Sequence, residues 1–136
     1  MVTAADEDTP IEIDVVAGHR HDAPLLRPML SRTIDRVGPV DEVVGDKGFD
    51  GGPQRRACRD RGAVPVIPAK SNRVSPEPLD VPAYRERNRI ERLFAKAKEF
   101  RRIATRYDKR KRMFLGWLHL VFGFIRLRAK TNVHRA

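Results

Sequence analysis

The chain has 136 residues, of which 40% are hydrophobic and 34% are charged. This length suits one domain of ordinary size or part of a larger one, and the apolar fraction allows a hydrophobic core. The one cysteine, Cys58, excludes a disulfide within the chain and a metal site built from cysteines. The acidic N-terminus lacks the apolar core of a signal peptide. The longest apolar stretch, residues 114–127, is too short for a membrane span of roughly 20 residues. These features predict a cytoplasmic protein with no membrane partner.

The net charge of +10 is concentrated in one segment. Residues 1–80 carry 11 Lys and Arg against 14 Asp and Glu, whereas residues 81–112 carry 13 against 4. Residues 113–136 carry 4 against none. A solvated charged helix is the simplest alternative, but such helices usually hold both signs in comparable numbers. The imbalance therefore predicts a polyanionic partner.

The chain begins with a pattern typical of a hairpin. Apolar and polar residues alternate over residues 11–16, which predicts a strand, and residues 2–5 are expected to form a shorter one, with a turn between them. Asp22 is expected to cap a helix over residues 23–35, which ends at Gly38.

Strands and a helix then alternate. Residues 40–45 predict a buried strand that finishes at Asp46, a Gly-Gly-Pro start opens a helix through Arg61, and residues 63–67 predict another strand. Residues 69–81 are expected to form a loop. This order predicts an α/β fold in which helices cover a sheet. Asp46 falls at the carboxyl end of a strand, where functional groups gather in open α/β sheets.

The remainder of the chain is expected to be helical. A basic helix over residues 82–99 is followed by a basic turn and by a helix over residues 110–129. The last helix is apolar nearly all round, which is typical of a buried helix. Its expected core residues are Phe114, Trp117, Leu118, Val121, Phe122 and Ile125. We thus expect three parts: residues 1–80 with the sheet and Asp46, residues 81–112 with the basic helix and turn, and residues 113–130 as a buried helix.

Tyr84, Arg87, Glu91 and Lys98 are the most informative group. A continuous α-helix turns by about 100° per residue, so their offsets place all four within a stripe roughly 60° wide. The stripe combines a carboxylate with an aromatic ring and two cations, and it lies beside the apolar face of the predicted helix.

These residue types suit phosphodiester chemistry. Two divalent ions about 3.5–4 Å apart can activate an attacking oxygen and stabilise a leaving one, and Mg²⁺ prefers carboxylate oxygens as ligands. Asp46 and Glu91 could supply such ligands, Arg87 and Lys98 could hold phosphates, and Tyr84 could stack on a base. The simpler alternatives are a turn role for Asp46 and a surface ion pair for Glu91, which contributes only about 0–1 kcal/mol.

The spacing Tyr84-(2)-Arg87-(3)-Glu91-(6)-Lys98 resembles the Y-(2)-R-(3)-E-(6)-K motif of DDE transposases of bacterial insertion sequences. The run Val-Gly-Asp46-Lys-Gly-Phe-Asp50 is similar to the segment that carries their second aspartate. Further similar segments cover residues 17–22, 66–73 and 100–109. The resemblance extends over essentially the whole chain.

The resemblance implies a ribonuclease-H-like fold, in which helices flank a mixed sheet. It implies DNA transposition, with two Mg²⁺ or Mn²⁺ ions held by Asp46 and Glu91 for strand cleavage and transfer. It also implies double-stranded DNA, both insertion-sequence ends and target, as the partner. The expected DNA contacts are Tyr84, Arg87, Lys98, Arg101, Arg102, Arg106 and Lys109.

One feature departs from the family pattern. The family has three acidic ligands, and its first aspartate lies upstream of the hairpin with which this sequence begins. The first carboxylates here, Asp6, Glu7 and Asp8, belong to the turn. We therefore expect an N-terminally incomplete catalytic domain that does not cut DNA alone. Asp14, Asp22 and Asp50 are the next candidate ligands if it does.

Three functions remain open at this stage. The chain could be a catalytic fragment or second-frame product, completed by an upstream transposase segment or by another copy. It could be an inactive module that occupies DNA ends or inhibits a full-length transposase. It could also be a remnant without a present role.

Overall fold

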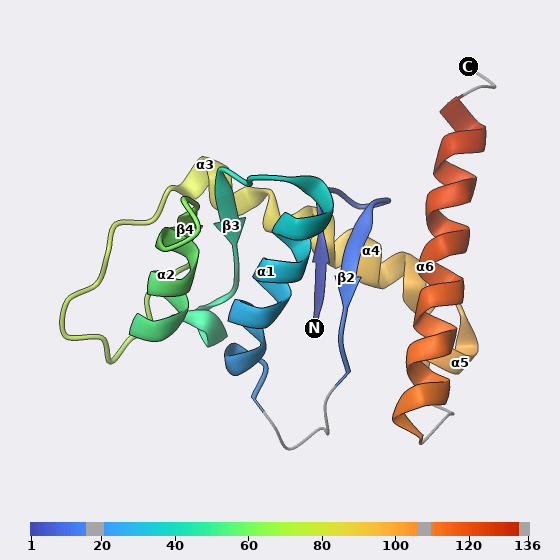
Figure 1. Ribbon diagram of the computed structural model, residues 1–136, viewed down its shortest axis with the longest axis horizontal. Helices are drawn as coiled ribbons and strands as arrows, with labels where there is room; N and C mark the ends of the chain where they lie inside the picture. Colours follow the sequence, from blue (N-terminus) through green and yellow to red (C-terminus); the bar gives the residue numbers. More distant parts are fainter. Residues whose placement is uncertain (16–20, 106–109, 134–136) are drawn as a thin grey trace. The chain divides into compact units, whose positions relative to one another are not determined.

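The computed structural model describes residues 1–15, 21–105 and 110–133 (Figure 1). The predicted DNA contacts Arg106 and Lys109 lie outside these residues. The chain divides into two compact units. Unit 1 comprises residues 1–16 and 89–136, and unit 2 comprises residues 17–88. Each unit is described by itself.

The first strands of unit 1 form the predicted hairpin. Strands β1 (Val2–Ala4) and β2 (Pro10–Ile13) pair antiparallel, with Val2 opposite Ile13. Asp6 organises the turn, since its carboxylate accepts hydrogen bonds from the Asp8 backbone N–H at 2.8 Å and the Thr9 hydroxyl at 3.0 Å. Such aspartate-centred turns are common because the short carboxylate reaches the backbone two residues on.

Helices α4 (Arg87–Lys98), α5 (Arg101–Ala104) and α6 (Lys111–Val133) provide the rest of unit 1. The short helix α5 lies where the sequence predicted a basic turn, so that prediction is wrong. The buried core joins α4, α5 and α6, and the hairpin packs against it. Its buried members are Leu93, Ala97, Ile103, Leu118, Val121, Phe122 and Ile125. Phe114 and Trp117 pack against this core while partly exposed, so the predicted core of the last helix is confirmed.

The prediction that α6 is buried all round is wrong. Its other side carries Met113, Leu120, Phe124 and Leu127, each more than half exposed. The helix has 23 residues and is about 35 Å long, and the other elements of unit 1 pack against only one side of it, so the other side stays exposed. Within the part of the chain that the structure describes, no helix has the length and apolar character that a membrane crossing needs.

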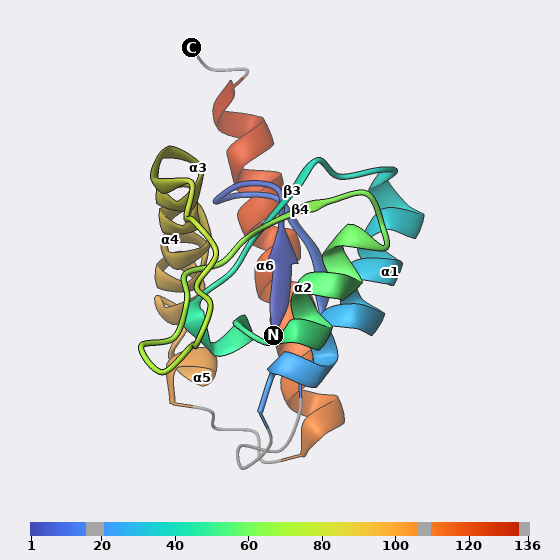
Figure 2. The same cartoon turned by 90° about the vertical axis from the view of Figure 1, so that its left-hand side faces the viewer.

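Unit 2 is built around a strand–helix–strand crossover. Strands β3 (Glu42–Val44) and β4 (Val64–Val66) pair in parallel, and α2 (Gly52–Arg59) connects them. Parallel strands need such a crossover because the end of the first strand and the start of the second lie at opposite edges of the sheet. Helix α1 (Leu26–Val37) packs against α2 (Figures 1 and 2). The remaining elements of unit 2 are two 3₁₀ helices (Ala23–Leu25 and Lys47–Phe49) and α3 (Val81–Arg85).

Two local predictions in unit 2 need correction. Asp22 makes no side-chain cap, because its backbone is already helical and it offers its carbonyl to the Leu25 N–H instead. Helix α2 ends at Arg59 rather than Arg61, where a tight turn leads to Gly62 at φ 78°. The predicted end of the preceding helix is confirmed, since Gly38 follows α1 with φ 86°, a conformation that favours glycine.

The predicted continuous helix over residues 82–99 is also wrong. Helix α3 ends at Arg85, and α4 begins at Arg87. Between them the Glu86 N–H donates to the Ala83 carbonyl at 3.1 Å, a three-residue hydrogen bond that tightens the turn. Tyr84 therefore lies on a different helix from Arg87, Glu91 and Lys98.

The α/β class is confirmed, with helices and two small sheets. Among the described residues, β1 pairs with β2 and β3 pairs with β4, in two separate two-stranded sheets. A single mixed sheet is therefore not present in these residues, and the ribonuclease-H-like arrangement remains a proposal.

Candidate catalytic cleft

Asp46 is held at the carboxyl end of β3. The ladder of parallel hydrogen bonds continues one residue beyond the strand, where the Gly45 N–H donates to the Val66 carbonyl at 3.1 Å. Asp46 then caps the 3₁₀ helix Lys47–Phe49, since its Oδ1 accepts the Gly48 N–H at 2.7 Å. An ionised carboxylate has about four acceptor sites, so this cap leaves capacity for further ligands.

An open cleft surrounds Asp46, and all of its lining residues belong to unit 2. The chain brings the carboxyl ends of β3 and β4 to the same edge, because the two strands are parallel. The segment after β4 and the residues around the α3–α4 junction complete the lining. The lining residues are Asp46, Lys47, Gly48, Pro68, Ala69, Lys70, Ser71, Asn72, Tyr84 and Arg87.

Tyr84 and Arg87 thus line the same cleft as Asp46, whereas Glu91 and Lys98 are not among its lining residues. Tyr84 lies on helix α3, whose N-terminus is stabilised in two ways. Asp80 caps the helix by accepting the Ala83 N–H at 3.0 Å, and Pro82 lies in its first turn. Proline suits the first turn of a helix because its missing N–H has no intrahelical partner there. In this lining, Asp46 is the one carboxylate among Lys47, Lys70 and Arg87.

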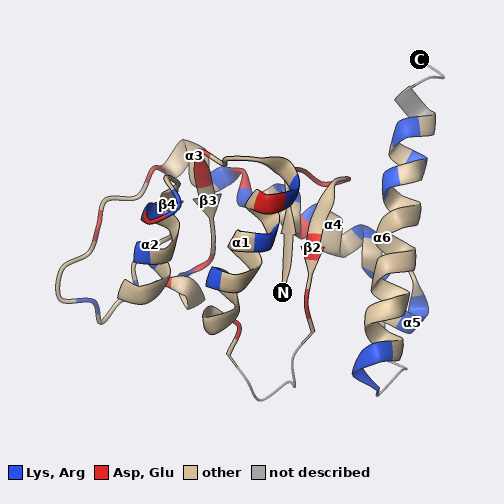
Figure 3. Ribbon diagram, in the orientation of Figure 1, with Lys and Arg blue, Asp and Glu red and all other residues tan. Residues whose placement is uncertain are grey.

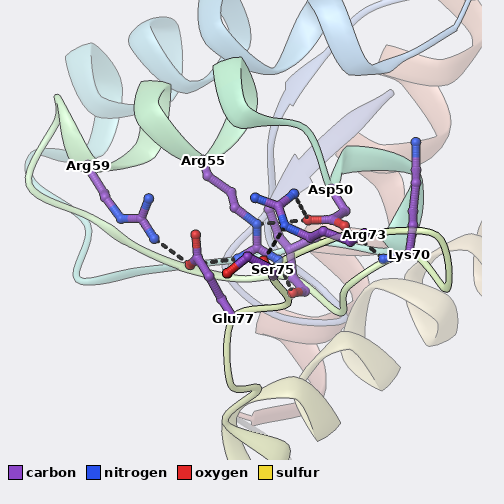
Figure 4. Close-up of polar contacts among 8 residues, drawn as sticks. Asp50, Arg55, Arg59, Lys70, Arg73, Ser75 and Glu77 are labelled. Carbon is purple, nitrogen blue, oxygen red and sulfur yellow. Dashed lines mark hydrogen bonds and ion pairs between the residues drawn. The ribbon is translucent and has the colours of Figure 1, made fainter.

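A buried ion network joins Asp50 and Arg55 to the segment that follows β4 (Figure 4). Asp50, at 6% exposure, accepts from Arg55 Nε at 2.9 Å, Arg73 Nη1 at 2.7 Å and the Lys70 backbone N–H at 2.7 Å. Burial alone would raise the pKa of Asp50, but the Lys70 N–H and the two guanidinium groups together hold that pKa below its usual value. Asp50 is therefore a structural anion, and the expectation that it could serve as a reserve metal ligand is not supported.

Arg55 is the residue that sequence reasoning missed. Its side chain is 2% exposed, and it also donates to the Ile67 carbonyl at 2.6 Å and to Glu77 at 3.1 Å. The sequence predicted only a helix through Arg61 and gave Arg55 no role of its own. The available signal was Asp50, a second carboxylate four residues after Asp46 and directly before that helix.

Glu91 and Lys98 lie on α4 in unit 1, and both are exposed. They are seven residues apart on one helix, which places them on the same side of it. The structure therefore groups Asp46, Tyr84 and Arg87 in the cleft of unit 2 and places Glu91 and Lys98 in unit 1.

The basic face of α4 is partly neutralised by the hairpin turn of unit 1. Lys96 Nζ lies 2.6 Å from Asp8 Oδ1 and 3.7 Å from a Glu7 oxygen, and Arg92 pairs with Glu7. Figure 3 shows further Lys and Arg on α5 and toward both ends of α6. With Lys111, which pairs with Asp14, at least three cations of the segment with net charge +9 are thus already engaged, which the sequence did not reveal.

Of the other predicted DNA contacts, Arg101 is exposed on α5. Arg102 stands 4.9 Å from the centre of the Trp117 ring, where a cation and an aromatic face attract. Neither observation tests contact with DNA, so these roles stay predictions.

The donor chemistry fits a divalent ion only in part. Asp46 offers a hard carboxylate oxygen of the kind that Mg²⁺ binds. Within the described residues, however, no group of three His, Cys, Asp or Glu side chains is gathered in a way that could hold a metal ion. Asp14 pairs with Lys111 at 3.3 Å and Asp22 is exposed, so neither reserve ligand joins Asp46 in its cleft.

Comparison with known families now bears on this cleft. A family model described as "Transposase DDE domain" matches residues 43–128, and a second model of the same description matches residues 1–78. The chain belongs to the DDE transposase family. Domains of this family generally use divalent metal ions, and transposases act in DNA transposition.

A curated relative agrees with this DDE transposase assignment. "Putative transposase for insertion sequence element IS6501" from Brucella ovis is 32% identical over 120 residues, which cover 88% of this chain and 89% of that protein. No solved structure matches the chain. The recognition drawn from the Tyr84 to Lys98 spacing is therefore confirmed at the level of the family.

Proposed function

We propose that this DDE transposase chain, when a further segment supplies the first aspartate, cleaves and transfers DNA strands at the ends of an insertion sequence. The observation that carries the proposal is the composition of the cleft, where Asp46 stands among Lys47, Lys70, Arg87 and Tyr84. A carboxylate surrounded by phosphate-binding cations suits a metal-dependent reaction on a polyanion better than it suits a small neutral substrate. Bacterial insertion sequences lie in DNA of the cytoplasm, so we expect the protein to act there.

Asp46 and Glu91 are the proposed catalytic carboxylates. The motif spacing supports the role of Glu91, and the strand-end position supports that of Asp46. In the proposed ribonuclease-H-like fold their carboxylates come within roughly 4–8 Å of one another, close enough to share divalent ions.

Each side chain has a distinct proposed task. Asp46 and Glu91 would hold two Mg²⁺ or Mn²⁺ ions, which supply the Lewis-acid chemistry of phosphodiester cleavage when bound. Arg87 and Lys98 would bind phosphates of the DNA end and fix its position. Tyr84 would stack on a base or bond a phosphate. Arg101, Arg102, Arg106 and Lys109 would extend the phosphate contacts along the basic segment.

The third carboxylate is proposed to come from a segment outside these 136 residues, either an upstream transposase segment or another polypeptide. Two carboxylates hold two divalent ions weakly, and nearby Arg and Lys side chains repel a weakly held cation. The chain by itself is therefore expected to bind DNA ends without cutting them.

A strand-cleavage assay on a terminal-repeat duplex tests this function. We expect no cleavage by the chain alone and Mg²⁺- or Mn²⁺-dependent cleavage when a segment with the first aspartate is supplied. Asp46→Asn and Glu91→Gln should each abolish the restored activity. Glu99→Gln, which changes an exposed carboxylate just beyond α4, should leave it intact.

Two results would contradict the proposal. Strong cleavage by residues 1–136 alone would mean that a third ligand lies within them. Stable DNA binding with no cleavage after complementation would favour the alternative, an inactive protein that occupies DNA ends or inhibits a full-length transposase.

A further inference from the structure

The segment between β4 and α3, residues 67–80, is held by hydrogen bonds and ion pairs at regular intervals, although its composition is typical of a loose loop. It carries Ser, Asn and several prolines and contains no helix or strand. Its fixed points are the Ile67 carbonyl, the Lys70 N–H, the Arg73 side chain and the Glu77 carboxylate. All four are bonded to either Asp50 or Arg55.

Asp50 and Arg55 are well suited to hold this segment because both are almost fully buried. The side chain of Asp50 is 1% exposed and that of Arg55 is 2% exposed, and they bond each other at 2.9 Å. A buried ion pair is retained only when its geometry is good and its remaining donors and acceptors are satisfied. Here those remaining groups are satisfied by the segment itself, so its position is coupled to the pair (Figure 4).

Between two of the fixed points the segment forms a tight turn. The Arg73 N–H donates to the Lys70 carbonyl at 3.1 Å. Lys70, Ser71 and Asn72 are exposed at this turn, and all three line the cleft that contains Asp46. The Lys70 ammonium, the Ser71 hydroxyl and the Asn72 amide are all hydrogen-bond donors, which is the chemistry that a phosphate requires.

We propose that Lys70, Ser71 and Asn72 form a DNA phosphate-binding turn, and that Asp50 is the positioning residue that holds this turn beside Asp46. The inference rests on the proposed function and adds to it the residues that contact the DNA backbone next to the cleavage site. In this proposal the backbone and the side chain of Lys70 have separate roles. The backbone N–H serves Asp50, while the side chain extends away from the network and stays available for phosphate (Figure 4).

This division allows a clean test, since Lys70→Ala removes the ammonium and keeps the N–H that bonds Asp50. Binding of a fluorescein-labelled DNA duplex to the full chain would be measured by anisotropy across a salt series. One lost phosphate contact should make the slope of log K against log salt shallower by about 0.9 and weaken binding about eightfold near 0.1 M salt. Arg27→Ala is the matched control, because it removes an exposed cation of unit 2 outside the cleft, and it should bind like the wild type.

The positioning role needs a separate readout. Asp50→Asn should speed hydrogen exchange at the Lys70 amide and shift the salt slope as Lys70→Ala does. The double variant should bind no more weakly than Asp50→Asn alone, because an unanchored turn no longer presents the ammonium. If Asp50→Asn does not fold, Arg73→Gln releases the turn from its partly exposed side and should give the same pattern.

The outcomes separate this inference from the proposed function. If the wild type binds DNA while Lys70→Ala leaves slope and affinity unchanged, the phosphate-binding turn is refuted and the proposed function stands. Hydrogen exchange at the Lys70 amide is compared between the wild type and Asp50→Asn, or Arg73→Gln if Asp50→Asn does not fold. If the exchange is equally fast in both proteins, Asp50 does not hold the turn. Absence of DNA binding by the wild type would refute both proposals.

Discussion

The acidic hairpin turn of unit 1 is expected to compete with DNA for the basic face of α4. Glu7 and Asp8 pair with Arg92 and Lys96, and Lys96 Nζ lies 2.6 Å from Asp8 Oδ1. Changing Glu7→Gln and Asp8→Asn together would release both cations. Asp6 stays in place, so the turn keeps the hydrogen bonds that shape it.

The magnitude follows from the exposure of these pairs. Their side chains are between 34% and 52% exposed, and such pairs contribute about 0–1 kcal/mol each. If DNA must displace both pairs, the double variant should bind up to about 2 kcal/mol more tightly, roughly a 30-fold change. Two additional phosphate contacts would also steepen the slope of log K against log salt by about 1.8.

Fluorescence anisotropy with a labelled duplex would measure both quantities. The control is Asp35→Asn with Asp60→Asn, which removes the same charge from exposed positions of unit 2. An equal gain in the control would show that net charge, not release of Arg92 and Lys96, increases the affinity. An unchanged slope in the Glu7 and Asp8 variant would refute the competition itself.

Three further predictions concern stability. Leu93→Ala should destabilise unit 1 by about 3 kcal/mol, measured by urea unfolding followed through Trp117 fluorescence. Leu127→Ala should destabilise it by under about 1 kcal/mol, because Leu93 is 0% exposed and Leu127 is 66% exposed. Because the pKa of Asp50 is lowered in the folded state, its stabilising effect is complete above its unfolded pKa of about 3.9 and is lost as pH falls through the folded value. Stability measured from pH 5 to pH 2 should thus fall more steeply in the wild type than in Asp50→Asn. Asp80→Ala should remove the cap of α3 and cost about 1 kcal/mol, with a threonine at this position restoring most of it by thermal melting.

Local patterns in the sequence predicted most elements of secondary structure correctly. The alternation before and after the acidic turn predicted the hairpin, and Gly38 predicted the end of α1, because both depend on residues close together in the chain. Two of the wrong predictions also concern local structure, namely the continuous helix over residues 82–99 and the Asp22 cap. At Glu86 the backbone N–H bonds the carbonyl three residues back, at Ala83, and this interrupts the expected helix. Asp22 has a helical backbone, and its carbonyl rather than its side chain accepts the Leu25 N–H.

The family and the candidate residues Asp46 and Glu91 could be predicted from spacing alone. A motif is a pattern of chemistry along the chain, and the matching family models confirm the family, while the roles of Asp46 and Glu91 stay predictions. Which residues share a cleft could not be predicted in this way. Lys47 and Lys70 join Asp46 because two parallel strands end at one edge, and parallel pairing is a long-range event that the local pattern does not encode.

The sequence by itself determined which chemical groups the chain contains: the Tyr84 to Lys98 motif, a basic segment and an apolar last helix. The tertiary structure decided how those charges are used. It buried Arg55 against Asp50, engaged Arg92 and Lys96 with the hairpin turn, and left one side of α6 exposed. The physical reason is that the stability and availability of a charge depend on its neighbours and on solvent, and these are set by packing between segments far apart in the chain.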